Sequence, residues 1–174
     1  MQRNEHSNFC ANLTPMPIDP RETTYYKRAR FTTRLPNAYL YSPSHYWVRE
    51  VEIGVLQIGM TKFATRMLGD FVEFSFKVAA GDRVAVGEAI GAIEGFKAVA
   101  DLYCVVTGAF LTSNPQVEPE PELVDSDPYD RGWLYQVRGG PTDELLDVAG
   151  YIDVLNATIE RMLAESKTEE DRNC

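Results

Sequence analysis

VAAGDRVAVGEAIGAIEGFKAVADLYCVVTG, residues 78–108, decides which fold is expected for this chain. Short apolar runs alternate in it with glycines, a pattern typical of short strands joined by tight turns. The apolar runs 89–93 and 102–106 flank Lys97, which predicts two antiparallel strands with the lysine at an exposed tip. A lysine amine at such a tip can be acylated by another enzyme, and its four-carbon stem lengthens any attached arm. From the local pattern alone, an ordinary solvated lysine remains the alternative.

The composition limits the other function classes. A chain of 174 residues with 44% hydrophobic content is expected to form one domain. Its 17 basic and 26 acidic residues give a net charge of −9, which disfavours a nucleic-acid partner and favours basic protein partners. The three cysteines, Cys10, Cys104 and Cys174, fit neither a disulfide framework nor a zinc site, so a reduced, cytoplasmic protein without a metal is expected. The N-terminal stretch lacks the apolar core of a signal peptide or membrane span.

The segments around the central stretch predict mostly strands. Prolines interrupt the aromatic-rich segment 31–47, which favours short strands at a sheet edge, and VEIGVLQIGM at 51–60 is typical of a buried strand. The segment FVEFSFKV at 71–78 alternates in the manner of a strand. The acidic, proline-rich segment 114–133 predicts an exposed loop with a short helical turn, and core packing is expected for Trp133 at its end.

Two helices are predicted between and after these strands. In TKFATRMLGD, Thr61 can cap the start and Gly69 the end of a short helix that places Phe63 and Met67 on one face. A longer helix follows Thr142, which can cap it, although Gly150 could introduce a break. Its expected packing face consists of Leu145, Val148, Ile152, Leu155, Ile159 and Met162.

The central stretch resembles the hairpin of lipoyl and biotinyl carrier domains that holds the prosthetic group. The matching positions, in the family order, are Gly81-Asp82, Gly87, Glu94, Lys97 and Gly108. Biotin carriers typically have methionine on both sides of the lysine, whereas this chain has Phe96 and Ala98. The resemblance therefore favours a lipoyl carrier, with a biotin carrier and an unmodified binding module as alternatives.

Three further segments resemble landmarks of the glycine cleavage H protein. They are SHYWVR at 44–49, GMTKFATRMLGD at 59–70 and DPYDRGWLYQV at 127–137, and the likeness covers roughly residues 40–155. The resemblance implies a mainly β fold with small helices, a flattened β-sandwich of the lipoyl-domain type (a barrel-sandwich hybrid) plus a C-terminal helix. The implied organisation is an N-terminal extension at 1–30, a lipoyl-carrier β domain at 31–140, and a helix packing on it with a polar tail at 141–174.

The same resemblance implies a non-catalytic protein with lipoate joined to Lys97. The attached arm swings between partner enzymes, and its ring sulfurs accept, hold and release the carried fragment while partner redox enzymes open and close the ring. Glu94 and Asp101 could orient the lipoate-attaching enzyme by charge, and Gly95 allows close approach. The alternative is that both carboxylates only hydrate or cap the turn.

Some residues of this chain depart from the H-protein pattern, and these departures bear on the pathway that the carrier serves. H proteins usually carry an acid between the residues matching His45 and Trp47, near the place where the loaded arm shelters, whereas this chain has Tyr46. Met67 stands where histidine is frequent. The expected shelter, formed by Ser44, His45, Tyr46 and Met67, is therefore more apolar than a cationic aminomethyl group favours.

These departures resemble H-protein-like lipoate-binding proteins of bacterial sulfur oxidation, and they tilt the interpretation slightly toward that pathway. The partners implied are lipoate-attaching enzymes, a dihydrolipoamide dehydrogenase-like enzyme and a heterodisulfide-reductase-like complex. The alternative is a glycine cleavage H protein that carries an aminomethyl group between glycine cleavage enzymes. Two further residues are expected to have structural roles. For Cys104, packing in the core is favoured over exchange with the lipoyl disulfide. For His45, a structural hydrogen bond is favoured over acid–base catalysis.

Overall fold

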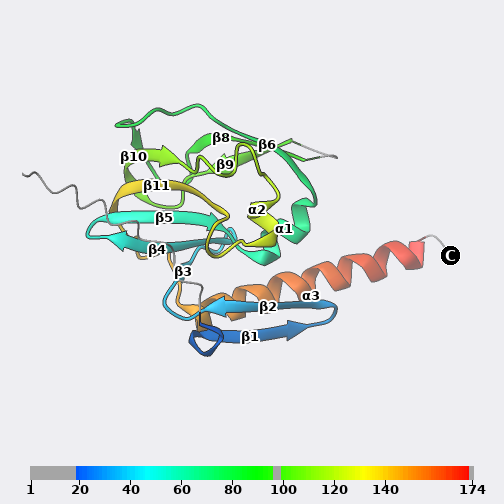
Figure 1. Cartoon of the computed structure of the whole chain (residues 1–174). Helices are drawn as coiled ribbons and strands as arrows, with labels where there is room; N and C mark the ends of the chain where they lie inside the picture. Colours follow the sequence, from blue (N-terminus) through cyan, green and yellow to red (C-terminus); the bar gives the residue numbers. More distant parts are fainter. Residues whose placement is uncertain (1–18, 96–98, 173–174) are drawn as a thin grey trace, which may run out of the picture.

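A computed structural model of the chain describes residues 19–95 and 99–172, with residues 1–18, 96–98 and 173–174 outside the described part (Figure 1). The strands are β1 (Thr23–Arg28), β2 (Phe31–Pro36), β3 (Leu40–Tyr41), β4 (Tyr46–Glu52), β5 (Val55–Met60), β6 (Phe71–Phe76), β7 (Arg83–Val84), β8 (Ala89–Gly95), β9 (Val99–Tyr103), β10 (Thr107–Ser113) and β11 (Trp133–Gly140). The helices are the 3-10 turn η1 (Pro20–Glu22), α1 (Lys62–Leu68), α2 (Leu123–Ser126) and α3 (Val148–Arg172).

Two antiparallel sheets form the upper body in Figure 1. One has six strands in the order β3-β4-β5-β11-β10-β7, and the other has three in the order β6-β8-β9. Their facing sides enclose one hydrophobic core, in which Ile58 of β5, Ile90 of β8 and Leu102 of β9 are fully buried. The predicted mainly β sandwich with small helices and a C-terminal helix is confirmed.

A second layer lies beneath this body. The antiparallel hairpin of β1 and β2 packs with α3 around a separate hydrophobic cluster (Figure 1). At its centre the rings of Tyr41 and Tyr151 stack at 4.7 Å between centroids. Arg28 and the hydroxyl of Tyr26 both donate hydrogen bonds to the Asn156 side chain, which joins the hairpin to the helix. The two strands of this hairpin lie on either side of residue 30, which is the predicted end of the N-terminal extension.

Helix α1 begins and ends where its caps predict. The Thr61 hydroxyl accepts a hydrogen bond from the Ala64 backbone N–H, and Gly69 ends the helix with a positive φ of 81°. Phe63 and Met67 line one cavity, as the predicted common face requires, but Phe63 is buried whereas Met67 is 52% exposed. The two residues differ in burial because the buried residues of this two-turn helix are Phe63 and the next two positions, while its second turn faces outward.

Helix α3 begins later than the sequence predicts. Thr142 does not cap it, because α3 starts at Val148, and the Asp147 carboxylate instead accepts the Gly150 backbone N–H. Gly150 lies inside the helix without a break. The delay has a long-range cause: the backbones of Leu146 and Tyr41 exchange two hydrogen bonds of 2.8 Å in an isolated β-bridge.

The buried face of α3 is centred on Tyr151, Leu155 and Ile159. Leu155 and Ile159 belong to the predicted packing face. Tyr151, which was not predicted to be on it, is fully buried, whereas the predicted Ile152 is only partly buried.

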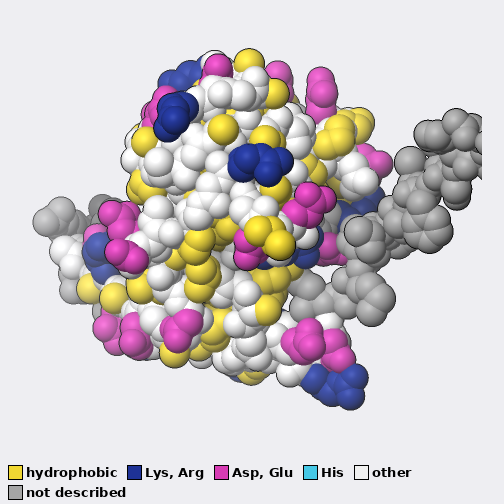
Figure 2. Space-filling model, turned by 90° about the vertical axis from the view of Figure 1, so that its left-hand side faces the viewer, with side chains coloured by type: hydrophobic (Ala, Val, Ile, Leu, Met, Phe, Trp, Pro, Cys, Tyr) yellow, Lys and Arg dark blue, Asp and Glu magenta, His cyan; other side chains and the backbone are white. Residues whose placement is uncertain are grey.

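The acidic segment 114–133 contains the expected helical turn, α2, and Trp133 at its end packs partly buried against the lower cluster. On the face shown in Figure 2, acidic side chains are spread over the surface with hydrophobic atoms between them.

Candidate functional site

The β8–β9 hairpin presents the candidate attachment site. Its antiparallel ladder runs up to the pair Glu94–Val99, and only residues 96–98 connect the two strand ends. Lys97 is one of these three and lies outside the described residues. Close packing holds the base of the hairpin, since a Cβ at Gly91 would lie 2.1 Å from the Ser75 carbonyl oxygen of β6. Glycine there allows β6 and β8 to approach as a sheet.

One side of this hairpin is exposed and acidic. Alternation along β9 puts Val99, Asp101 and Tyr103 on the outer face, where all three are exposed. Glu94 is the cross-strand partner of Val99, and Glu73 of β6 pairs with Glu94 in turn. Three carboxylates therefore lie on the outer face of the three-stranded sheet. The predicted recognition residues Glu94 and Asp101 are among them, and Gly95 ends β8 opposite Phe71.

Tyr103 connects this outer face to a cavity. Its hydroxyl donates a 3.2 Å hydrogen bond to the Asp101 carboxylate, and this bond raises the pKa of the tyrosine. Tyr103 also lines a cavity of about 270 Å³, here called the serine pocket, together with Ser42, Ser44 and Glu144. The hydroxyls of Ser42 and Ser44 are hydrogen bonded at 2.6 Å. The pocket thus brings hydroxyl groups together with a carboxylate at the end of β9 farther from Lys97.

His45 points away from the serine pocket into the lower layer. Its backbone has a positive φ of 69°, and its Nδ1 shares a 2.9 Å hydrogen bond with the Tyr151 hydroxyl, which also bonds Thr61 Oγ1 at 2.8 Å. The imidazole packs on Phe63 with 4.6 Å between ring centroids. Burial, with a smaller effect of the positive charge of Arg161, lowers the pKa of His45 from 6.5 to about 4. At neutral pH this histidine is an uncharged hydrogen-bonding group.

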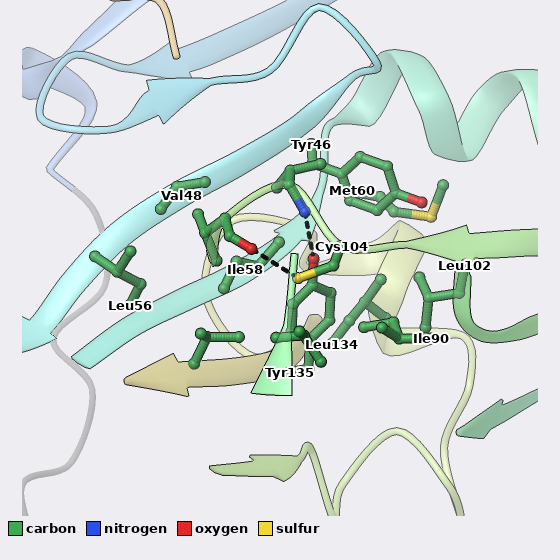
Figure 3. Packing of buried hydrophobic residues seen from close by; sticks show 14 of the residues in the cluster. Tyr46, Val48, Leu56, Ile58, Met60, Ile90, Leu102, Cys104, Leu134 and Tyr135 are labelled. Carbon is green, nitrogen blue, oxygen red and sulfur yellow. Dashed lines mark hydrogen bonds between the residues drawn. The ribbon is translucent and has the colours of Figure 1, made fainter. Parts of the chain in front are cut away.

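Tyr46 and Met67 lie in two further places. Tyr46 is buried in the upper core beside its cross-strand partner Met60, and burial raises the pKa of its hydroxyl to about 12 (Figure 3). Met67 lines a different cavity, between α1 and α3. Of the four residues expected to shelter the arm, the structure therefore places only Ser44 at the serine pocket.

Cys104 packs in the core as predicted. Its side chain is fully buried below the hairpin, and Sγ donates a 3.1 Å hydrogen bond to the Val106 carbonyl oxygen (Figure 3). Burial raises the pKa of the thiol, which keeps the sulfur protonated. Cys104 contributes to the wall of the serine pocket without exposing its thiol. Among the described residues it is the free cysteine, and no group of three or more metal-ligating side chains occurs among them.

Comparison with known proteins identifies the family. The sequence profile of the Glycine cleavage H-protein matches residues 39–156, which include both strands of the β8–β9 hairpin and the serine pocket. The chain belongs to the glycine cleavage H-protein family.

Curated relatives agree over most of their length. The glycine cleavage system H protein of Aeromonas hydrophila is 37% identical over 132 residues, covering 71% of this chain and 98% of the relative. The glycine cleavage system H protein of Listeria monocytogenes is 43% identical over 125 residues, covering 70% of this chain and 98% of that relative. The crystal structure of an H protein from Mycobacterium marinum has a TM-score of 0.61 and 30% identity, covering 67% of this chain and 95% of that one.

Compared with the family match, this H-protein family member has additional structure at both ends. The β1–β2 hairpin precedes residue 39, and α3 continues for 16 residues beyond residue 156. Of the helices in the described part, none has the length and apolar character needed to cross a membrane.

Sequence reasoning missed three residues at the serine pocket. Tyr103 could have been found, because it lies two residues after Asp101 on the same strand face. Ser42 and Glu144 carry no local signal, since the fold brings them together from segments about 100 residues apart.

Proposed function

We propose that this H-protein family member is a lipoyl carrier that holds lipoate in amide linkage on Lys97. The observation that carries the proposal is the β8–β9 ladder, which is paired up to Glu94 and Val99 and leaves only a three-residue connection containing this lysine. A paired ladder gives a fixed base, and lysine supplies an amine that can be acylated. Bound lipoate supplies reversible dithiol–disulfide chemistry. The protein positions the group within its 31–140 carrier region and catalyses no reaction itself.

The acidic outer face would be recognised by the enzyme that attaches lipoate. Glu94 and Asp101 lie on it with Glu73, and among the described residues none of these three carboxylates has a basic partner within ion-pair distance. Charges left unpaired on a surface steer a partner of opposite charge. We therefore expect a basic rim on the attaching enzyme, and Gly95 leaves room for its approach.

The serine pocket favours an aminomethyl cargo. A cationic amine needs a carboxylate or hydroxyl partner when it leaves water. The pocket offers Ser44 and Glu144, and Asp101 adjoins it through Tyr103. These groups supply the negative charge that Tyr46 does not. The partners proposed on this basis are the glycine cleavage enzymes and a dihydrolipoamide dehydrogenase-like enzyme, and the buried free thiol of Cys104 suits a reducing cytoplasm.

A sulfur cargo is the second candidate, with a heterodisulfide-reductase-like complex as partner. One observation favours it: the position that usually carries an acid holds Tyr46, whose buried hydroxyl has its pKa raised to about 12 and stays neutral. A soft, polarizable sulfur group tolerates apolar surroundings.

The attachment site is tested by intact mass after expression with a competent lipoylation system. Lys97→Arg should lose the lipoyl mass increment while its circular dichroism stays unchanged, because arginine keeps the charge but not the acylable amine. Lys77→Arg, at an exposed position after β6, is the matched control and should remain modified. Lipoylation of the Lys97→Arg protein would contradict the assignment, and a biotin increment would favour the biotin carrier.

The cargo is tested by reconstitution with glycine cleavage enzymes. The lipoylated protein should support glycine decarboxylation, and Glu144→Gln should reduce the rate because the pocket loses its carboxylate. Glu118→Gln, a change at an exposed acid of another loop, is the control. Poor glycine turnover together with acceptance of sulfur by the dihydrolipoyl form would instead support the second candidate.

A further inference from the structure

A second cavity lies between the two layers, away from the β8–β9 hairpin. It has a volume of about 300 Å³ and is bounded by the β1–β2 turn, α1 and α3. We call it the arginine pocket. Its apolar lining consists of Phe31, Phe63, Met67, Ile159, Met162 and Leu163. Its size is at the small end of the range of about 300–1,000 Å³ that is typical of sites for small ligands.

The walls of this pocket come largely from outside the family match. The β1–β2 turn, residues 28–31, precedes the matched region, and the α3 residues 159–166 follow it. Only the α1 wall lies within residues 39–156. The pocket therefore depends on the two segments that this chain adds to the matched H-protein region.

The rim of the arginine pocket is positively charged although the chain has a net charge of −9. Arg28 is already occupied, because it bonds Asn156 at 2.7 Å and forms an ion pair with Glu160. Arg66 holds its guanidinium 5.7 Å from the centre of the Phe31 ring. Within the described residues, neither Arg30 nor Arg66 has a carboxylate at ion-pair distance.

The acid that interacts with Arg66 is already paired with another base. Against burial, which raises it, the pKa of Asp125 is lowered by hydrogen bonds from Lys62 and Thr65 and by the charges of Lys62 and Arg66, and the Asp125 carboxylate is ion-paired with Lys62 at 2.8 Å. Two guanidinium groups therefore remain beside an apolar cavity. Such a combination is complementary to a molecule with an apolar chain and one anionic head.

We propose that the arginine pocket binds a small amphipathic carboxylate, with its alkyl chain in the cavity and its carboxylate at Arg30 and Arg66. The chain would contact Phe31, Ile159 and Leu163. Because these residues belong to β2 and α3, the ligand would join the added hairpin to the helix beside α1, and its binding would stabilise this junction. The site is distinct from the lipoyl attachment proposed at Lys97.

The test is isothermal titration calorimetry of the full chain with straight-chain carboxylates of increasing length. Affinity should rise about fourfold for each added methylene until the cavity is filled, and then level off. Alcohols of the same length should bind about tenfold more weakly, because they lack the charge that the arginines pair with. Binding should also raise the melting temperature as ligand concentration increases.

Variants separate the head group from the chain. Arg30→Gln and Arg66→Gln should weaken carboxylate binding while leaving alcohol binding unchanged, and Arg83→Gln on the exposed surface of β7 is the matched control. Leu163→Asp places a charge at a half-exposed position of the wall and should remove binding of both ligands, with circular dichroism to verify folding.

Three outcomes would overturn the proposal. They are absence of binding at the solubility limit of the longest carboxylate, equal affinity for carboxylate and alcohol, and carboxylate affinity that neither arginine substitution changes. Anionic phospholipids also combine an apolar chain with an anionic head, so vesicles of such lipids test whether the pocket binds a membrane surface instead of a free carboxylate. Co-sedimentation with these vesicles, without binding of free carboxylates, would replace a small-molecule site by a lipid-surface contact.

Discussion

Acidification should destabilise the protein through His45. The imidazole is held neutral between the Tyr151 hydroxyl and the Phe63 ring, and burial lowers its pKa to about 4. In the unfolded chain the same group titrates near 6.5. The unfolded state therefore binds a proton at a higher pH than the folded state, which shifts the equilibrium toward unfolding as the pH falls.

The size of this effect follows from the two pKa values. The difference between 6.5 and about 4, at about 1.4 kcal/mol for each pKa unit, corresponds to about 3 kcal/mol of unfolding free energy. The contribution is complete above pH 6.5, declines between pH 6.5 and 4, and is lost below pH 4, where both states are protonated. Because a marginal domain has about 5–15 kcal/mol in total, the loss should be measurable.

The assay is urea unfolding of wild type and His45→Asn at several pH values from 7.5 to 4. Asparagine tolerates the positive φ of 69° better than most residues and does not titrate in this range. The variant should be less stable at pH 7.5, and its deficit should shrink by about 3 kcal/mol at pH 4. Nuclear magnetic resonance can identify the imidazole directly, because the chain has two histidines and the variant removes one signal. A deficit that is independent of pH, or a His45 signal titrating near 6.5, would refute this reasoning.

Two further predictions concern the core. Gly59→Ala should destabilise the fold by about 1–3 kcal/mol, because its Cβ would lie 2.5 Å from the buried Trp47 ring, which is fixed by a 2.7 Å hydrogen bond from Nε1 to the Pro128 carbonyl oxygen. Gly140→Ala, where a Cβ meets no atom within 4 Å, is the control for urea unfolding, and equal effects of the two changes would contradict the steric argument. Cys104 should resist iodoacetamide in the folded protein and react only after denaturation, as followed by peptide mass. Rapid alkylation of the native thiol would show that it is accessible.

Local sequence signals predicted those parts of the fold that depend on neighbouring residues. The glycine and apolar pattern around Lys97 predicted the β8–β9 hairpin, and Thr61 and Gly69 predicted the ends of α1. These features depend on period-two alternation and on backbone hydrogen bonds within a few residues. The two cavities could not be predicted in this way, because each joins segments from distant parts of the chain.

The expected arm shelter shows where adjacency in sequence misleads. Ser44, His45 and Tyr46 are consecutive, yet they contact the serine pocket, α3 and the upper core, respectively. The positive φ of 69° at His45 interrupts the extended chain just before β4, so the alternation of an ordinary strand does not apply there. No signal in the sequence distinguishes this histidine from one with an extended backbone.

The late start of α3 and the position of the Glu144 carboxylate at the serine pocket have one cause. Thr142 followed by acidic residues is a normal helix start, and a helix beginning there would carry Glu144 in its first turn. The two hydrogen bonds between Leu146 and Tyr41 instead limit the helix signal to a single turn, closed by a 3.1 Å hydrogen bond from the Leu145 N–H to the Thr142 carbonyl oxygen, and hold this turn near Ser42, the next residue after Tyr41. Glu144 lies two residues before this bridge and consequently faces the pocket with Ser42. The tertiary contact that overrides the local helix signal therefore also supplies the acid proposed to receive a cationic cargo.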